Sequence, residues 1–268
     1  MITASVVLFN NALDDISNVL GCMVKSAIDK VYVIDNSPST GLYDAILGDP
    51  KIDYLYVGKN IGFGRAHNIA FQMAFEASSD YHIVINPDVT FKDDVVSELL
   101  SFMDKNKNVG LIMPKVLFPN GSLQYLCKML PTPFDIFGRR FLPKELIKRR
   151  NAYYQMEKTG YDKIMNVPCL SGCFMFLRMQ MIKKIGGFDD RFFMYFEDFD
   201  LCRRLHTVSK TIYYPFVSIM HVCASEHHRK FSLFKISFIS ALKYFNKWGW
   251  LFDKQRVQIN RECKEMNY

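Results

Sequence analysis

The sequence lacks the long apolar run that a membrane-spanning helix requires. No stretch of about eighteen uncharged apolar residues occurs among its 268 residues. The N-terminus enters a strand-like run at once, without the basic segment and the small-residue cleavage site of a secretory leader. We therefore expect a cytoplasmic protein.

Cysteine pairs at metal-binding spacing are also missing. The cysteines are odd in number and scattered, and none forms a CxxC pair, so neither a zinc finger nor a disulfide framework is predicted. We interpret them as reduced residues that lie mostly in the core. The seven are Cys22, Cys127, Cys169, Cys173, Cys202, Cys223 and Cys263.

Neither of the two common phosphate-binding loops occurs. The segment GKNIGFGRAHNIA lacks the third glycine of GxGxxG and the Gly-Lys-Ser/Thr of a P-loop, which disfavours a dinucleotide or ATP site. A nucleotidyltransferase on a similar sheet is one alternative function, but it would prefer a glycine-rich loop directly after the first strand. That position reads LFNNALDD instead.

The residues that are present suit a globular enzyme with an anionic partner. A hydrophobic content of 49% and a charged content of 23% predict one large domain, with or without a C-terminal extension. The net charge of +7 favours a nucleotide diphosphate, a lipid surface or nucleic acid. A nucleic-acid-binding protein would explain the basic cluster Arg139–Arg150. It would not explain the carboxylates at Asp88 and Glu197–Asp200, which repel phosphates unless a metal intervenes.

Short β-branched runs alternate with helical periodicity in the first half of the chain. This pattern is typical of βαβ units and a parallel sheet, with ligand-binding loops at the carboxyl ends of the strands. The predicted strands are Thr3–Phe9, Lys30–Ile34, Ile52–Val57 and His82–Ile85, and the predicted helices are Leu13–Ala27, Gly62–Ala77 and Asp93–Lys105.

Two of these loops carry groups suited to a nucleotide. Asp35 follows an apolar strand, where a carboxylate can accept hydrogen bonds from a ribose or a base, although an Asx turn or a helix cap is an equal alternative. Gly58–Ala70 opens a helix whose N–H groups suit a diphosphate, with Arg65 and His67 adding charge. A helix start with chance cations is the alternative there.

Two residues are candidate metal ligands. Asp88, in the sequence Asn-Pro-Asp, lies beyond a buried strand, where a carboxylate can hold a divalent cation that bridges two phosphate oxygens. His221 follows a strand-like run, and a neutral imidazole is a common metal ligand. A turn for Asp88 and a satisfied polar role for His221 remain open.

Carboxylates gather among aromatic residues in GGFDDRFFMYFEDFDLCRRL. The aromatic rings would desolvate an interspersed carboxylate and raise its basicity toward that of a general base. Some of the acids can instead be helix N-terminal carboxylates. Asp200 is the structural candidate, because Arg203 and Arg204 lie three and four residues on, at the spacing of a helical ion pair.

The order of these motifs resembles one family. N-x-G-F-G-x-x-H-N, N-P-D, L-S-G, G-G-F-D and F-x-Y-x-E-D-x-D-L-C-x-R, followed by a histidine, are similar to the GT-A family 2 glycosyltransferases, in their rhamnosyltransferase-like branch. The resemblance covers Ser5 to His221. It implies an α/β GT-A fold, with a mostly parallel central sheet flanked by helices. We expect a catalytic domain over 1–225, with a nucleotide-binding half to about 118 and an acceptor-side half after it, and a helical extension over 226–268.

The resemblance also implies roles for individual residues. Asp198 would be the catalytic base, and Asp88 and His221 would hold a divalent metal, Mg²⁺ or Mn²⁺, although Asn86 replaces the first acid of the D-x-D motif. The expected donor-binding residues are Phe9, Asp35, Asn60, Gly62, Arg65, His67, Asn68 and Asn86. The expected acceptor-side residues are Gly172, Glu197 and Asp189.

The expected reaction is an inverting glycosyl transfer. L-Rhamnose from dTDP-rhamnose, or a hexose from a UDP-sugar, would pass to a hydroxyl of a lipid-linked or surface glycan, and nucleic acid is not an expected partner. Pro131–Asn166 matches no family motif, and we expect it to cover the acceptor. Phe231–Phe252 is predicted to be a helix that packs on the domain or rests on the inner face of a membrane, where Lys235, Lys243 and Lys247 would favour anionic lipid. Its predicted apolar face is Phe231, Phe234, Phe238, Phe245 and Trp248.

Overall fold

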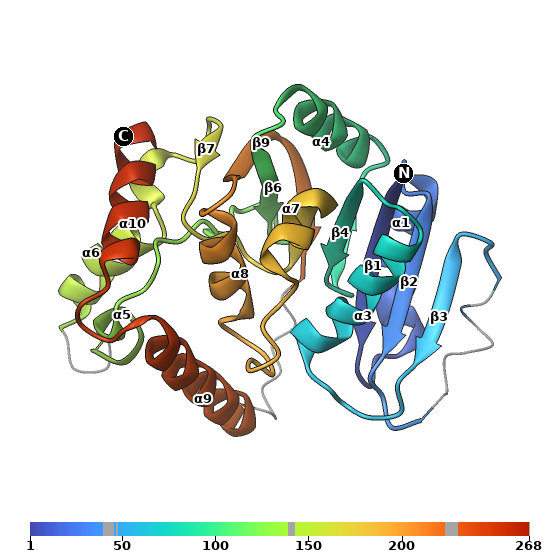
Figure 1. Cartoon of the computed structure of the whole chain (residues 1–268), viewed down its shortest axis with the longest axis horizontal. Coiled ribbons are helices and arrows are strands. Elements are labelled where there is room, and N and C mark those ends of the chain that lie inside the picture. The colour runs from blue at the N-terminus through green and yellow to red at the C-terminus, as the bar shows by residue number, and fades with distance from the viewer. Residues whose placement is uncertain (40–45, 47, 139–142, 223–229, 268) are drawn as a thin grey trace.

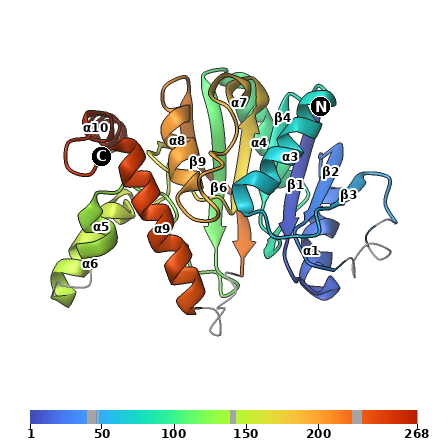
Figure 2. The same cartoon turned by 60° about the horizontal axis from the view of Figure 1, so that its bottom comes forward.

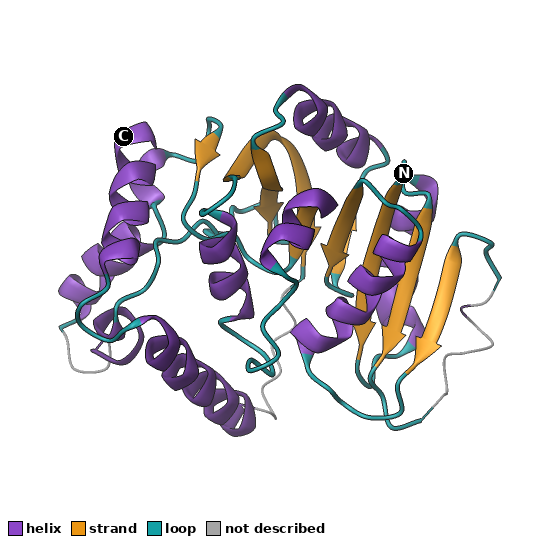
Figure 3. Ribbon diagram, viewed as in Figure 1, coloured by secondary structure: helices purple, strands orange, loops and turns teal. Residues whose placement is uncertain are grey.

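The computed structural model describes residues 1–39, 46, 48–138, 143–222 and 230–267. In this part of the chain nine strands form a single sheet, in the order β3-β2-β1-β4-β8-β6-β9-β5, with β7 paired to β9. Helices cover both faces of the sheet (Figure 3). The strands are β1 (Ile2–Leu8), β2 (Lys30–Asp35), β3 (Ile52–Tyr56), β4 (Tyr81–Ile85), β5 (Val89–Phe91), β6 (Val109–Leu117), β7 (Met165–Asn166), β8 (Phe174–Arg178) and β9 (Lys210–His221).

The N-terminal half is a parallel α/β layer. Strands β3, β2, β1 and β4 pair in parallel with one another. The runs of β1, β2 and β4 are almost wholly buried, as expected for a sheet covered on both faces, whereas the edge strand β3 is mostly half-buried. The predicted strands and helices of this half are confirmed, with ends that differ by at most two residues. The helices are α1 (Leu13–Lys25), α3 (Phe63–Glu76) and α4 (Asp94–Lys105).

The second half adds antiparallel strands. Strand β8 is antiparallel to both β4 and β6, whereas β6 and β9 are parallel, with a register shift at Pro114 and Lys115. Strand β5 pairs with the end of β9, so that Val89 lies opposite His221. This pairing brings the Asn-Pro-Asp loop beside a residue far away in the sequence. Two helices complete this half, α7 (Met179–Ile185) and α8 (Glu197–Leu205).

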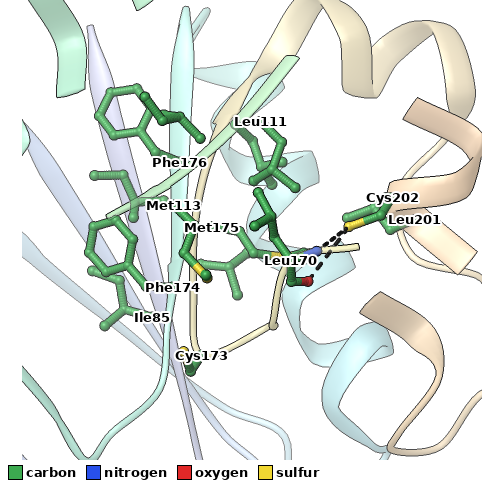
Figure 4. Close-up of a cluster of buried hydrophobic side chains, with 14 of the residues drawn as sticks. Ile85, Leu111, Met113, Leu170, Cys173, Phe174, Met175, Phe176, Leu201 and Cys202 are labelled. Atoms are coloured by element: carbon green, nitrogen blue, oxygen red, sulfur yellow. Dashed lines mark hydrogen bonds between the residues drawn. The ribbon is translucent and has the colours of Figure 1, made fainter. Parts of the chain in front are cut away.

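A buried apolar cluster joins β8 to α8 (Figure 4). The Cys202 thiol donates to the Leu170 carbonyl at 3.6 Å, and the Leu170 N–H points back at the same sulfur at 3.4 Å. Of the six cysteines that the structure describes, five are buried and none is in a disulfide, which confirms the predicted reduced core residues. Cys223 lies outside the described residues. The cluster fixes the segment before β8 against the middle of α8.

The C-terminal helices gather at the end of the molecule opposite β3 (Figures 1 and 2). Helix α9 ends before the predicted limit, because Gly249 adopts φ +105° and turns the chain. None of the described helices is long and apolar enough to cross a membrane. These elements are α5 (Pro133–Phe137), α6 (Lys144–Tyr154), the 3-10 turn η2 (Glu157–Thr159), α9 (Lys230–Trp248) and α10 (Lys254–Asn267).

A buried ion pair fastens the C-terminal helices to α8. Arg203 is 1% exposed and Asp253 is 6% exposed, and the guanidinium contacts both carboxylate oxygens. The guanidinium also lies 4.2 Å from the Trp248 ring, and its Nε donates to Gln255. The hydrogen bonds and the aromatic face replace the water that the cation loses on burial.

Removing one partner of this pair should destabilise the fold strongly. Asp253→Asn leaves the Arg203 charge buried without its counter-ion, and we expect a loss of about 3–5 kcal/mol in the free energy of unfolding. Chemical denaturation measures it. The matched control is Glu265→Gln, because the Arg261–Glu265 pair on α10 is more than two-thirds exposed, and we expect a change of about 0.5 kcal/mol or less. Equal effects of the two substitutions would contradict this account of the extension.

Candidate active site

A cavity of about 510 Å³ opens at the carboxyl ends of β1, β2 and β4. Its described lining combines apolar side chains with amides and carries no charged residue. Three predicted donor-binding residues, Phe9, Asn60 and Gly62, line it. The lining residues that the structure describes are Val7, Phe9, Asn10, Asn11, Asn36, Asn60, Gly62, Phe63, Pro87, Phe193, Met194, Ser232, Leu233 and Ile236.

Gly62 lets two segments of the cavity wall approach closely. It has φ +93°, and a Cβ on it would lie 2.4 Å from the Phe193 carbonyl oxygen. That oxygen accepts a hydrogen bond from the Phe63 N–H at 2.8 Å. The Asn60 side chain accepts from the Gly62 N–H at 3.0 Å, which sets the turn before α3. Glycine is therefore required here for both conformation and space.

Asn36 offers an unused acceptor at the cavity. Its amide nitrogen donates to the Gly62 carbonyl at 3.3 Å, while its side-chain oxygen is buried and has no hydrogen-bond partner. A buried acceptor in this state suits a ligand N–H or O–H. The nucleotide contact predicted from the sequence at this strand end is the preceding residue, Asp35. Asp35 itself is fully buried and accepts from the Ser37 N–H at 2.8 Å and from the Tyr54 hydroxyl, so its contact with a nucleotide remains a prediction.

His67 does not add charge to the cavity, which corrects the sequence-based expectation. It is fully buried, its Nδ1 lies 2.7 Å from the Ser5 hydroxyl, and burial lowers its pKa well below the usual value. Ser5 also contacts His82, whose pKa burial lowers to about 3. Both imidazoles are thus neutral core residues. The reason is topological, since α3 lies across β1 and turns His67 toward the sheet.

Arg65 and Asn68 also lie away from this cavity. Arg65 is exposed, and its Nε donates to the Asp190 carbonyl at 3.1 Å. Asn68 exchanges two hydrogen bonds of 2.8 Å with the backbone of Phe188. Both side chains therefore tie α3 to the loop before α8, and their expected contacts with the donor remain predictions.

Asp88 and His221 lie side by side, as a metal ion shared between them requires. His221 Nε2 lies 3.3 Å from Asp88 Oδ1. The other ring nitrogen, Nδ1, lies 3.0 Å from Gln124 Oε1, and Gln124 Nε2 donates to the His221 carbonyl at 2.7 Å. Because the amide nitrogen is used as a donor, Oε1 accepts from Nδ1–H, and Nε2 is left to face the carboxylate. Gln124 belongs to no recognisable motif and is not among the residues predicted from the sequence.

A strained corner introduces the acidic pair. Tyr195 and Phe196 have φ values of 68° and 67°, which cost about 1–3 kcal/mol each for residues with side chains. The Phe196 ring packs against Tyr244 and Phe245 of α9, at 5.4 and 6.5 Å between ring centroids. Helix α8 begins at the next residue. The corner therefore sets the direction of its first two side chains.

The two acids of the pair have different surroundings. Glu197 is buried, one oxygen has no partner, and burial together with neighbouring Asp198 raises its pKa well above the usual value. Asp198 accepts from the Phe199 N–H at 2.8 Å and the Gly172 N–H at 3.4 Å. Burial raises the Asp198 pKa, whereas Lys128 and these N–H groups oppose that rise. As the pH falls, Glu197 therefore takes up a proton before Asp198 does.

Lys247 of α9 forms ion pairs with two other acids of this cluster, Asp189 and Asp200. Lys247 lies 2.7 Å from Asp189 and 2.5 Å from Asp200, and Arg204 lies 2.7 Å from Asp200. The predicted helical ion pair of Asp200 is confirmed for Arg204, whereas Arg203 contacts Asp253 instead. Asp189 also binds Arg191, and together these cations hold its pKa below the usual range. The carboxylate of Asp189 is thus already ion-paired, and its expected acceptor-side role remains a prediction.

Cys173 links the two halves of the site. Its carbonyl accepts a hydrogen bond from the Asn86 N–H at 2.9 Å. Burial raises the pKa of its thiol to about 12, and the negative charges of Asp88 and Asp198 act in the same direction. A Cβ on Gly172 would touch the Asp198 side chain and the Phe63 ring. The candidate metal ligands, the candidate base and the cavity wall therefore surround one short segment.

Adding one methyl group at Gly62 should disrupt this wall. Gly62→Ala places Cβ against the Phe193 carbonyl, so we expect weaker nucleotide binding and a lower thermal midpoint. The matched control is Gly121→Ala, because Gly121 also has positive φ, +81°, but open space around its Cβ position. Calorimetry of both variants separates contact from backbone strain. If the two variants lose the same stability, the close approach of Phe193 is unimportant.

The sequence matches a known protein family and several of its members. Residues 6–186 match the family described as Glycosyl transferase family 2. The chain is 29% identical over 206 residues to an N-acetylglucosaminyl-diphospho-decaprenol L-rhamnosyltransferase of Mycobacterium tuberculosis, which covers 71% of this chain and 66% of that protein. It is 27% identical over 237 residues to rhamnosyltransferase WbbL of Escherichia coli, which covers 87% and 85%.

Solved structures share the fold at low sequence identity. GalNAc-T7, solved with UDP, GalNAc and Mn²⁺, has a TM-score of 0.62 and 13% identity, over 84% of this chain and 43% of that one. TarS of S. aureus has a TM-score of 0.61 and 13% identity, over 98% and 70%. The predicted GT-A fold is thus confirmed, and the chain belongs to glycosyl transferase family 2.

Proposed function

We propose that the protein is an inverting glycosyltransferase that moves L-rhamnose from dTDP-rhamnose, or a hexose from a UDP-sugar, to a hydroxyl of a lipid-linked or surface glycan. The observation that carries the proposal is the arrangement around Gly172 and Cys173. The Gly172 N–H donates to Asp198, and the Cys173 carbonyl accepts from the N–H of Asn86, which lies two residues before Asp88 of the Asp88–His221 pair. The names of the two curated relatives favour rhamnose as the sugar.

The residues at Asp88 fit a divalent cation, Mg²⁺ or Mn²⁺. A carboxylate oxygen and an imidazole nitrogen that face each other at 3.3 Å need a proton or a cation between them. Among the described residues no group of three or more such ligands occurs, so the donor diphosphate and water would complete the shell. When bound, the cation stabilises the charge of the departing nucleotide. Gln124 orients the imidazole toward it.

Asp198 takes the proton of the attacking hydroxyl in this proposal. Its two N–H contacts and Lys128 favour its ionised form, whereas Glu197 beside it retains a proton. Two neighbouring carboxyls with separated pKa values are typical of divided acid and base roles. Glu197 and Gly172 then position Asp198 rather than act on the acceptor.

The donor would occupy the cavity. Asn36 and Asn60 present amide groups to the nucleotide, and Phe9 and Phe63 supply apolar surface. Residues 1–225 would form the catalytic domain. Residues 226–268 would form an extension that brings the protein, as a cytoplasmic and peripheral enzyme, to the inner face of the membrane where a lipid-linked acceptor lies.

Substituting the base should abolish transfer and leave donor binding intact. Asp198→Asn keeps the side-chain shape, and we expect turnover to fall by about 10² to 10⁴. Turnover of the wild type should rise with pH through the raised pKa of Asp198, because only the ionised carboxylate accepts the proton. The measurement is steady-state transfer from dTDP-rhamnose and UDP-hexoses, with product stereochemistry assigned by NMR.

Asp200→Asn is the matched control. Asp200 is fully buried between Lys247 and Arg204, so this change should cost stability of about 3 kcal/mol and retain most turnover in the folded fraction. The base assignment fails if Asp198→Asn turns over normally, or if Asp200→Asn loses more turnover while it remains folded. A product that retains the anomeric configuration would overturn the inverting reaction.

A further inference from the structure

The turn between α9 and α10 exposes three consecutive large apolar side chains. Leu251 is 77% exposed, Phe252 is 96% exposed and Trp250 is 37% exposed. Isolated exposed apolar residues are ordinary, but a contiguous group of them marks a surface that binds something apolar. Asp253 follows immediately and is fixed by Arg203, so the turn is held outward on a rigid support.

This turn continues into an aromatic surface on α5 and α9. The ring of Phe137 lies 6.1 Å from Trp250 and 5.4 Å from Phe238 between centroids, and Phe238 lies 6.2 Å from Phe234. Phe234 and Phe238 are both more than 40% exposed. We name this set the C-terminal apolar surface. Its members are Phe134, Phe137, Phe234, Phe238, Trp250, Leu251 and Phe252.

Positive charge accompanies this surface. Helix α9 contains no acidic residue. Its Lys243 and Lys247 bind backbone and carboxylate oxygens of the segment Asp189–Asp200, whereas Lys235 is exposed. Lys148 and Arg149 on α6, and Lys254 after the turn, are exposed as well. Apolar and aromatic side chains beside exposed cations are the composition that binds the interface of an anionic bilayer.

Helix α9 connects the surface to the cavity. Leu233 and Ile236 line the cavity, whereas Phe234 and Phe238 of the same helix face solvent. Farther along, Tyr244 and Phe245 are buried against the catalytic domain. The helix therefore has two apolar faces, and protein contacts cover only part of them. A surface that contacts the C-terminal apolar surface also lies near the cavity.

We propose that the C-terminal apolar surface docks on an anionic lipid bilayer, with α9 lying along the interface and Leu251 and Phe252 inserted among the lipids. This deepens the proposed function, because it specifies how a lipid-linked acceptor would reach the cavity. Vesicle binding itself requires neither donor nor acceptor. It can therefore fail while the enzyme activity holds, or hold while the enzyme activity fails.

The test is co-sedimentation of the full chain with phosphatidylcholine vesicles that contain phosphatidylglycerol, compared with pure phosphatidylcholine vesicles. We expect binding to the anionic vesicles that weakens with added salt. Leu251→Ser with Phe252→Ser should lower the partition coefficient at least about tenfold, and Lys235→Gln about fivefold. The matched control is Phe216→Ser, because Phe216 is 67% exposed but packs beside Tyr214, whose ring contacts Phe102 of α4. This control should bind as the wild type does.

Three outcomes would overturn the proposal. The first is that the wild type does not bind anionic vesicles at low salt. The second is that the double variant, with an unchanged thermal midpoint, binds as tightly as the wild type. The third is that the double variant converts a dimer into a monomer in vesicle-free solution, which would make this surface an interface between two copies of the chain.

Discussion

The site depends on how α9 holds the left-handed corner at Tyr195 and Phe196. Two consecutive residues with positive φ are unfavourable, and the packing of Phe196 against Tyr244 and Phe245 offsets the cost. Hydrogen bonds support the same segment, since Ser240 donates to the Met194 carbonyl at 2.8 Å. The C-terminal helices therefore shape the catalytic half, although they lie outside the part of the chain that the family match covers.

The same helix selects which acids remain available for chemistry. Lys247 of α9 neutralises Asp189 and Asp200, and the corner leaves Glu197 and Asp198 at the start of α8 without such a partner within salt-bridge distance in the described structure. Burial without an ion pair raises both pKa values, and backbone N–H groups favour charge on Asp198. The first turn of α8 thus holds both a structural carboxylate, Asp200, and the candidate base, Asp198.

Local patterns in the sequence predicted the parallel strands of the first half and the helices between them, because β-branched alternation and helical periodicity depend on neighbouring residues. The antiparallel strands of the second half were not predicted. The family resemblance implies that Asp88 and His221 lie close together, and the pairing of β5 with β9 brings them there. His67 could not be placed, because its burial depends on Ser5 and His82 on distant strands. Lys247 binds Asp189, which lies 58 residues away in the sequence. Local sequence periodicity cannot indicate a contact between residues so far apart.

The central claim is that Asp88 and His221 hold a divalent cation together with the donor diphosphate. The most direct test is the affinity for Mn²⁺, measured by electron paramagnetic resonance in the presence of dTDP or UDP, for the wild type, His221→Gln and Gln124→Ala. We predict nucleotide-dependent binding that weakens about 10- to 100-fold in Gln124→Ala and more in His221→Gln. Unchanged Mn²⁺ affinity in His221→Gln, with nucleotide bound and the fold intact, would contradict the claim.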